Sequence, residues 1–332
     1  MSALSPEPIL RHVYGYWASS ILATSLRCDL FSYLQSSPST VAELATRASI
    51  SPRSTQALLD ALLGMGLVEK AGPDSYRNTL LASAYLVKGQ PEYLGGYAGM
   101  ILSTWRDWEK LPDVVASGKP LHRQEDPNPH NPFWEDLVRA LAPLSFPPAR
   151  AAAKSLGIAD RQVFDFLDIA GGAGGYSAIW LGLNPKARSV QLDWPNVNAI
   201  ARSYVTSFGV ADRLRTIDGD METTDLGESL YDCVIYSNIA HGISSARNTA
   251  MFRKIKRALK PGGSLMIVGL VPSEERTGSP LLMMFNVNLM LNSEEGGTHV
   301  GSEYAAWLRE ADFSTVQFEG VEELPFTLIF AA

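Results

Sequence analysis

The chain has 332 residues, of which 46% are hydrophobic and 19% charged, as in an ordinary folded protein rather than a disordered one. A formal net charge of −7 provides no electrostatic footprint for nucleic acid or an anionic membrane, so neither is expected as a partner. Two distant cysteines, no leader pattern and no membrane-spanning apolar run predict a cytoplasmic protein with a small-molecule or protein partner. The histidines and cysteines form no metal-binding set, so no metal is expected.

The N-terminal part of the chain has the pattern of helices. Residues 12–35 carry apolar residues at helical spacing, and Asp29 introduces no obvious break. Ser39 and Thr40 are suited to cap a short helix, and a second helix is predicted over residues 53–65.

A small hairpin is expected around Gly72, Pro73 and Asp74, after the second of these helices. Helix, turn, helix and hairpin together make a winged helix. Such a unit can read DNA, but the helix over 53–65 offers one cation, Arg53, among leucines that indicate burial. This pattern favours packing or self-association over DNA binding.

A helical connector is predicted over residues 96–155, between the winged helix of residues 1–95 and the remainder of the chain. It carries four aromatic residues on both sides of a polar Pro/Asn-rich loop at 124–132: Trp105, Trp108, Phe133 and Trp134. These rings either belong to a core or line a cavity between domains, where small-molecule pockets often form.

Short apolar strands alternate with helical segments over residues 156–332. This alternation predicts an α/β fold with a mostly parallel, doubly wound sheet. Ligands bind such sheets beyond the carboxyl ends of the strands, so the candidate site residues are those that end each strand.

The first two strands end in groups typical of a nucleoside site. "LDIAGGAGGYS" places Asp168 before a glycine-rich turn containing Gly171, Gly172 and Gly174, where a backbone can approach a ligand closely. The third position of a dinucleotide fingerprint is Ser177 instead of glycine, which disfavours a nicotinamide cofactor. Asp193, in "QLDWP", stands where an acidic residue grips ribose hydroxyls.

The next two strands end in "DGDM" and "YSNIAHG". Asp220 and Met221 are expected beside an adenine ring, and His241 follows the fourth strand. Three interpretations of His241 are open: a general base, a group that positions substrate, or a cap for the helix beginning near Ser244.

These motifs occur together in the order and spacing of one enzyme family. "LDIAGGAGGYS", "LDWPNV", "GDM", "SNIAHG", "LKPGGSLMIVGLVP" and "EEGGTHVGSEYAAWLREADF" resemble small-molecule O-methyltransferases of the caffeic-acid and acetylserotonin type and their bacterial secondary-metabolite relatives. The resemblance implies a Rossmann-like class I methyltransferase domain, S-adenosylmethionine as cofactor, and a homodimer formed through the winged-helix N-terminal domain.

The resemblance also implies residue roles. Gly171, Gly172 and Gly174 would cradle the methionine and ribose parts of the cofactor, and Ala170 replaces the first glycine of the usual motif. The full expected cofactor set is Asp168, Gly171, Gly172, Gly174, Asp193, Trp194, Asp220, Met221 and Ser237, the last at a position where many relatives carry lysine. The expected substrate-binding set is Trp105, Trp134, Met284 and Asn288.

His241 aligns with the family's catalytic base, but both carboxylates that normally flank that base are absent. Gly269 and His299 stand at their positions, and Glu294 or Glu295 is a candidate substitute. His299 is included with His241 as a catalytic residue.

A histidine without an orienting carboxylate is expected to be a weaker base. O-methylation by His241 would then suit an acceptor more acidic than a plain phenol, whose pKa is near 10. The alternatives are C- or N-methylation, a reaction that uses the cofactor without methyl transfer, and a DNA-binding regulator.

Overall fold

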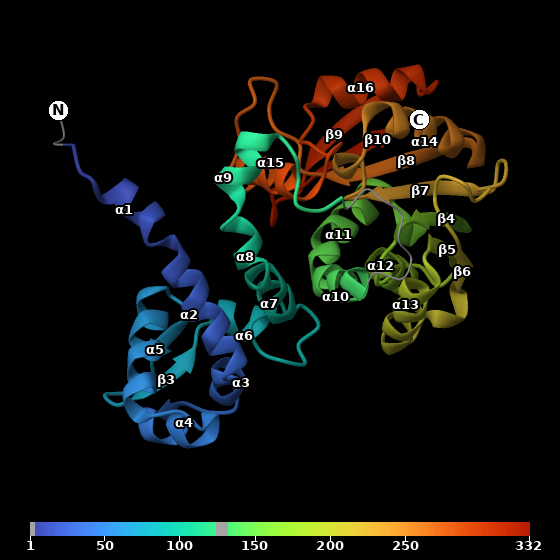
Figure 1. The fold of residues 1–332 in the computed structure, drawn as a ribbon. Coiled ribbons are helices and arrows are strands. Elements are labelled where there is room, and N and C mark those ends of the chain that lie inside the picture. Colours follow the sequence, from blue (N-terminus) through green and yellow to red (C-terminus); the bar gives the residue numbers. More distant parts are fainter. Residues whose placement is uncertain (1–3, 124–131) are drawn as a thin grey trace. The chain divides into compact units, whose positions relative to one another are not determined.

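A computed structural model describes residues 4–123 and 132–332 (Figure 1). All of the predicted Pro/Asn-rich loop except Pro132 lies outside the described residues. The chain separates into two compact units, with the boundary between Trp105 and Arg106, inside the segment predicted as a connector.

The N-terminal unit contains helices and a small antiparallel sheet of strand order β1-β3-β2. Its elements are α1 (Glu7–Val13), α2 (Gly15–Arg27), α3 (Leu30–Gln35), β1 (Ser39–Thr40), α4 (Val41–Ala48), α5 (Pro52–Gly64), β2 (Val68–Lys70), β3 (Ser75–Asn78), α6 (Leu80–Tyr85) and α7 (Gly95–Ser103). The predicted hairpin is confirmed as β2 and β3, and the helix predicted over 53–65 is confirmed as α5.

Local hydrogen bonds explain where the helices of this unit begin. Thr40 caps α4 in a capping box, because its hydroxyl accepts the Glu43 amide at 3.4 Å and Glu43 accepts the Thr40 amide at 2.7 Å. Ser51 caps α5, with Pro52 in the first turn. Leu59 and Leu62 of α5 are buried in the core of the unit.

The prediction of an uninterrupted helix over residues 12–35 is wrong. α1 ends at Val13, α2 ends at Arg27, and Asp29 adopts a left-handed conformation with φ of 57° before α3 begins. The Asp29 carboxylate pairs with Lys88 at 2.8 Å, a tertiary contact 59 residues away that no local pattern reveals. Aspartate tolerates this backbone region better than most residues.

The C-terminal unit is built on a seven-stranded sheet of order β6-β5-β4-β7-β8-β10-β9 (Figure 1). Its strands are β4 (Phe164–Ile169), β5 (Ala187–Asp193), β6 (Leu214–Asp218), β7 (Tyr231–Ser237), β8 (Leu259–Gly269), β9 (Val316–Gly320) and β10 (Thr327–Ala331). β4 to β8 run parallel, whereas β10 is antiparallel to both β8 and β9. The predicted doubly wound sheet is confirmed.

Helices cover both faces of this sheet. The helices of this unit are α9 (Leu111–Ser117), α10 (Pro132–Leu141), α11 (Phe146–Ser155), α12 (Gly175–Leu183), α13 (Pro195–Ser207), α14 (Ser245–Ala258), α15 (Pro280–Asn292) and α16 (Gly301–Glu310), with α8 (Trp105–Trp108) at the boundary between the units. Among them, α14 and α16 pack on one face of the sheet, and α11 and α12 pack on the other. Short 3-10 helices occur at Ala142–Ser145, Ile158–Asp160, Ala211–Arg213 and Ala240–Gly242.

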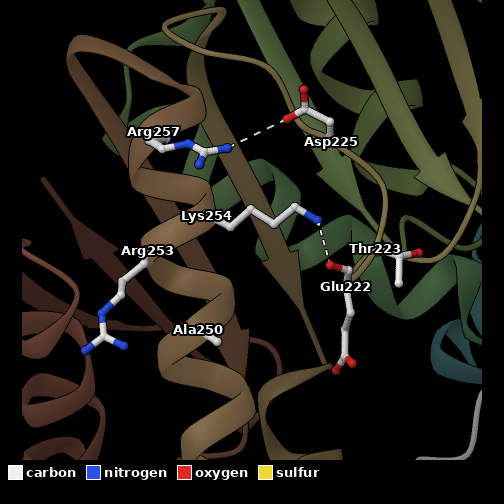
Figure 2. A pocket seen from close by; sticks show the side chains of 7 residues that line it. All are labelled: Glu222, Thr223, Asp225, Ala250, Arg253, Lys254 and Arg257. Atoms are coloured by element: carbon white, nitrogen blue, oxygen red, sulfur yellow. Dashed lines mark hydrogen bonds and ion pairs between the residues drawn. The ribbon is translucent and has the colours of Figure 1, made fainter.

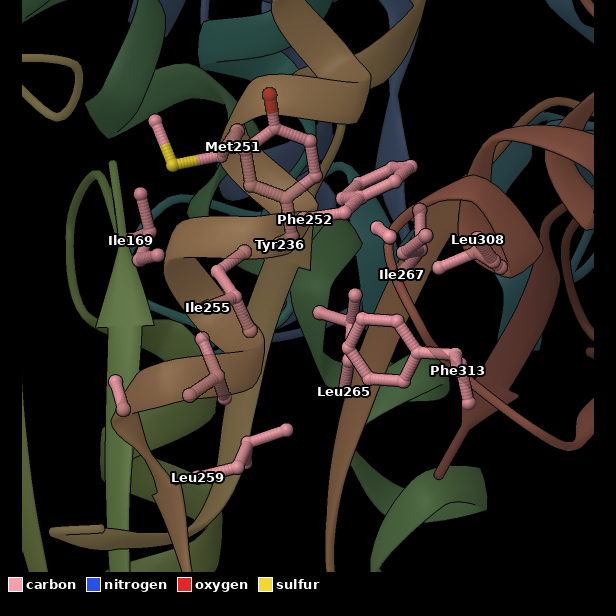
Figure 3. Close-up of a cluster of buried hydrophobic side chains, with 14 of the residues drawn as sticks. Ile169, Tyr236, Met251, Phe252, Ile255, Leu259, Leu265, Ile267, Leu308 and Phe313 are labelled. Atoms are coloured by element: carbon pink, nitrogen blue, oxygen red, sulfur yellow. The ribbon is translucent and has the colours of Figure 1, made fainter. Parts of the chain in front are cut away.

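Alternate residues of the central strands pack into two cores. Leu167 of β4 and Tyr236 of β7 contribute to the core that contains Phe252 of α14 and Leu308 of α16 (Figure 3). Phe166 of β4 belongs to the opposite core, formed with α11 and α12. Burial on both faces explains why the strands appear in the sequence as nearly continuous apolar runs. Because β4 to β7 run parallel, their carboxyl ends lie at the same edge of the sheet.

Candidate functional site

The turn after β4 requires glycine at two positions for different reasons. A Cβ at Gly171 would lie 2.7 Å from Cγ of Asp168 and 2.8 Å from Oε1 of Gln191, so a side chain there would displace both. Gly174 has φ of 80° and lies where a Cβ would be 2.9 Å from Val205. Ala170, the departure from the usual glycine, adopts φ of 50°. The loop therefore brings bare backbone to the edge of the sheet.

Beneath this turn lies a cradle of buried polar atoms. Three buried oxygen atoms have no hydrogen-bond partner in the described part of the chain: both carboxylate oxygens of Asp168 and Oε1 of Gln191. Burial, reinforced by the Asp193 carboxylate, raises the pKa of Asp168 well above its usual range. Because unpaired buried polar groups are costly, this arrangement suits a ligand that brings donors or positive charge. The ammonium and sulfonium groups of S-adenosylmethionine meet that requirement.

Asp193 ends β5 beside the same turn. Its two carboxylate oxygens accept the Gly172 amide at 2.9 Å and the Trp194 amide at 2.8 Å. Burial outweighs these bonds and raises the pKa of Asp193 to about 6. Each oxygen keeps a lone pair, so the side chain has the acceptors that a ribose diol needs. Trp194 stands half-buried at the start of α13.

The pKa of Asp193 leads to a testable pH dependence. Ribose hydroxyls donate best to an ionised carboxylate, and Asp193 carries a proton below pH of about 6. We expect calorimetric affinity for S-adenosylhomocysteine to be level above pH 7 and to fall by about 10-fold for each unit below 6. Asp193→Asn should bind more weakly at pH 7 and lose this dependence. An unchanged pH profile in that variant would assign the titration to another group.

The ends of β6 and β7 supply the remaining predicted cofactor residues. Asp220 accepts the Glu222 amide at 2.6 Å, which shapes the segment after β6, and Met221 packs against the core. Ser237 Oγ lies 3.0 Å from the hydroxyl of Tyr176, which burial holds at a raised pKa. Sequence reasoning missed Tyr176 and Gln191. The only signal was a polar side chain within an otherwise apolar strand or helix.

His241 lies in the short 3-10 helix Ala240–Gly242, beyond the end of β7. Its ring meets Phe285 of α15 edge-on, with 5.0 Å between centroids. The Nδ1 atom is buried and has no hydrogen-bond partner among the described residues. Burial, with a contribution from His299, lowers the pKa of His241 to about 4, so the imidazole is neutral at pH 7.

The alternative that His241 caps the following helix is wrong. α14 begins after Ser244, whose amide donates to Glu295 Oε2 at 3.0 Å, and the imidazole makes no bond to this helix. The main chain of His241 is held instead by the Gly297 amide, which donates to its carbonyl at 2.9 Å. Phe285 thus contacts the ring and Gly297 holds the main chain, while the buried Nδ1 keeps its lone pair unused among the described residues.

His299 occupies a similar environment on the segment before α16. Its Nε2 atom is buried without a partner in the described chain, and its ring lies 4.7 Å from that of Trp307. Nδ1 is 3.9 Å from Glu303 Oε2. Burial lowers the pKa of His299 despite this nearby carboxylate.

Neither suggested substitute for the missing carboxylates contacts His241. Glu294 forms an ion pair with Arg123 at 2.8 Å, and Glu295 pairs with Arg247 at 3.2 Å while accepting the Ser244 amide. The sequence left open whether one of them substitutes for the missing carboxylates, and these contacts give no support to that possibility. A Cβ at Gly269, the other altered position, would lie 3.6 Å from the Tyr304 hydroxyl.

The structure places the four predicted substrate residues in different surroundings. Trp105 belongs to the N-terminal unit, where its ring lies 5.7 Å from that of Tyr16. Trp134, on α10, packs edge-on against Phe133. On α15, Met284 is 57% exposed, whereas the next residue, Phe285, contacts His241. Asn288 accepts a hydrogen bond from Asn292 at 3.2 Å.

Two further observations concern metals and membranes. Within residues 4–123 and 132–332, no three His, Cys, Asp or Glu side chains are grouped to hold a metal ion. Among the same residues, no helix has the length and apolar character needed to cross a bilayer.

Comparison with known proteins identifies the family of this chain. Residues 152–314 match the O-methyltransferase domain model, and residues 10–88 match the O-methyltransferase dimerisation domain model. The chain belongs to the family of S-adenosylmethionine-dependent small-molecule O-methyltransferases. The resemblance inferred from the motifs is confirmed, and the cofactor of this methyltransferase is S-adenosylmethionine.

Relatives align with the methyltransferase along nearly its whole length. It is 28% identical to the tetracenomycin polyketide synthesis 8-O-methyl transferase TcmO of Streptomyces glaucescens, over 95% of this chain and 94% of the relative. It is 29% identical to 3-hydroxy-5-methyl-1-naphthoate 3-O-methyltransferase of Streptomyces sahachiroi, over 91% and 88%. A crystal structure of a Nostoc punctiforme O-methyltransferase shares the fold, with a TM-score of 0.88, 24% identity and 99% coverage of both chains.

Proposed function

We propose that this methyltransferase transfers a methyl group to an acidic hydroxyl of a small aromatic or polyketide-like acceptor, with His241 as the general base. The observation that carries the proposal is the buried, unpartnered Nδ1 of a neutral imidazole beside an aromatic ring, Phe285. The two Streptomyces relatives, named for a polyketide and for a hydroxynaphthoate, support this acceptor class.

The acidity of the acceptor follows from the pKa of His241. Proton transfer from a phenol with a pKa near 10 to an imidazole with a pKa of about 4 is uphill by about 8 kcal/mol. Each unit by which the acceptor is more acidic lowers that difference by about 1.4 kcal/mol. A hydroxyl conjugated with a carbonyl group is therefore a better match than a plain phenol.

Different residues of the chain would bind the cofactor, accept the proton and hold the acceptor. Bound S-adenosylmethionine supplies the electrophilic methyl group. Asp168 and the glycine turn would hold the cofactor, with Asp193 at the ribose and Asp220 with Met221 at the adenine. His241 Nδ1 would accept the acceptor's proton, and His299 Nε2 would bond a second polar atom of the acceptor. Phe285 would pack on its ring, in addition to the predicted Trp134 and Asn288.

We also propose a homodimer formed through the N-terminal unit. That unit matches the dimerisation domain model, and several of its large apolar side chains are exposed, among them Ile9, Tyr16 and Trp17. Self-association would bury them. Light scattering should return twice the chain mass.

A gel shift on random duplex DNA at low salt tests the alternative that the protein is a DNA-binding regulator. The cytoplasmic location remains a prediction.

The acceptor preference is testable with matched compounds. We would incubate the enzyme and cofactor with hydroxynaphthalenes that differ only in a carbonyl group conjugated with the hydroxyl. We expect the more acidic member of each pair to be methylated at least about 10-fold faster, and mass spectrometry with NMR to identify a methyl ether. Methyl groups on carbon would contradict O-methylation, and equal rates would contradict the acidity argument.

A further inference from the structure

The side chain of Arg247 joins two segments that belong to the proposed site. The cofactor segment, defined as residues 220–222, follows β6 and carries Asp220 and Met221. The acceptor segment, defined as residues 293–297, precedes His299. Arg247, in the first turn of α14, bonds Glu222 Oε1 at 2.7 Å and Glu295 Oε2 at 3.2 Å.

The cofactor end of this bridge is anchored at several atoms. Lys254, two helical turns after Arg247 on the same face of α14, donates to the carbonyls of Met221 at 2.8 Å and Glu222 at 3.0 Å. Figure 2 shows Lys254 reaching from α14 to Glu222. The Glu222 amide in turn donates to Asp220. These hydrogen bonds tie Glu222 to Asp220 and, through Lys254, to Met221.

The acceptor end is fixed just as closely. Glu295 accepts the Ser244 amide, and hydrogen bonding to that amide, with Arg247 beside it, lowers the pKa of Glu295. Gly297 donates to the His241 carbonyl, and Gly296 donates to Ser293 Oγ at 2.8 Å. A Cβ at Gly296 would be 2.9 Å from the His241 carbonyl oxygen. The segment that Arg247 holds is therefore packed against the main chain of the base.

We infer that Arg247 is a positioning residue that couples cofactor binding to the order of the acceptor segment beside His241. This inference rests on the proposed function, because it takes Asp220 and Met221 to contact the nucleoside. When those residues are held by a ligand, Glu222 is held too, and Arg247 then restrains Glu295. Its guanidinium presents several donors in a fixed plane, so it can bond both carboxylates at once, which a lysine does less well.

Hydrogen exchange on the full-length protein tests the coupling without an acceptor. We expect saturating S-adenosylhomocysteine to slow exchange in peptides covering residues 293–300 by about 5-fold in the wild type, at the lower end of ordinary coupling between sites. In Arg247→Met the slowing should disappear, while S-adenosylhomocysteine still binds. Arg253→Met is the matched control, because Arg253 lies on the same helix but pairs with Glu310 at 2.8 Å.

The outcomes separate this inference from the proposed function. Failure of the wild type to bind S-adenosylhomocysteine would overturn the cofactor assignments themselves. Binding with equal protection in wild type and Arg247→Met would overturn the role of Arg247 alone. If Arg247→Met does not fold, Glu222→Gln and Glu295→Gln each weaken one half of the bridge. Both should reduce the protection, and unaltered protection in both would also overturn it.

Discussion

His241→Ala is expected to reduce kcat by about 100-fold to 10,000-fold, the range associated with loss of a general base. The affinity for S-adenosylhomocysteine should be unchanged, because the imidazole forms no hydrogen bond to the proposed cofactor residues. Steady-state kinetics with the best acceptor of the matched series, together with calorimetry, would measure both quantities.

A separate readout distinguishes a base from a group that only fills space. The variant leaves a gap beside Phe285, so added imidazole and related bases should restore part of the rate, and the more basic compounds should restore more. His122→Gln is a suitable control, because His122 is half exposed and pairs with Asp107 at 3.2 Å. A loss below about 10-fold, or rescue that ignores the pKa of the added base, would mean that His241 only positions the acceptor.

The pH profile of the wild type also tests whether His241 is the base. With the pKa of His241 lowered to about 4, the base is neutral across the physiological range. The acid limb of kcat/KM due to His241 should therefore lie near pH 4. A limb near the usual histidine value of about 6.5 would show that the ring is more solvated in solution than its buried Nδ1 indicates.

The sheet and the positions of the site residues could be predicted because both depend on local sequence. Strands buried on both faces appear as apolar runs, and parallel strands bring their carboxyl ends to one edge. Asp168 and Asp193 lie at the carboxyl ends of such runs, and His241 lies in the short segment that follows another. Their approximate location did not require knowledge of any long-range contact.

The contacts made by charged side chains could not be predicted in the same way. Glu294 and Glu295 are adjacent to the site in sequence, but their partners are Arg123 and Arg247, which the fold brings from distant positions. α15 presents a related difficulty. Its apolar residues are spread around the helix rather than gathered on one face, so periodicity cannot show that Phe285 rather than Met284 contacts His241. Which face meets the base depends on tertiary packing.

Asp168→Asn is expected to raise the free energy of unfolding and to lower the affinity for the cofactor. The folded-state pKa of Asp168 is raised, so its ionisation destabilises the fold at any pH above the unfolded value of about 3.8. The neutral amide removes that penalty. The free energy of unfolding at pH 7, measured by chemical denaturation, should rise. The variant also loses a charged partner for the cofactor, and affinity for S-adenosylhomocysteine should fall by about 10-fold to 150-fold.

Asp165→Asn provides the matched comparison, because Asp165 lies three residues earlier on the same strand. Its carboxylate pairs with Arg188 at 2.8 Å and Lys260 at 2.9 Å, and these partners lower its pKa. Its ionisation therefore stabilises the fold above pH of about 4 and ceases to do so in acid. Asp165→Asn should lower the free energy of unfolding and leave cofactor affinity unchanged. If Asp168→Asn instead destabilised the protein and bound S-adenosylhomocysteine normally, the unpaired carboxylate would be part of the scaffold, and the cofactor's positive charge would have to be met elsewhere.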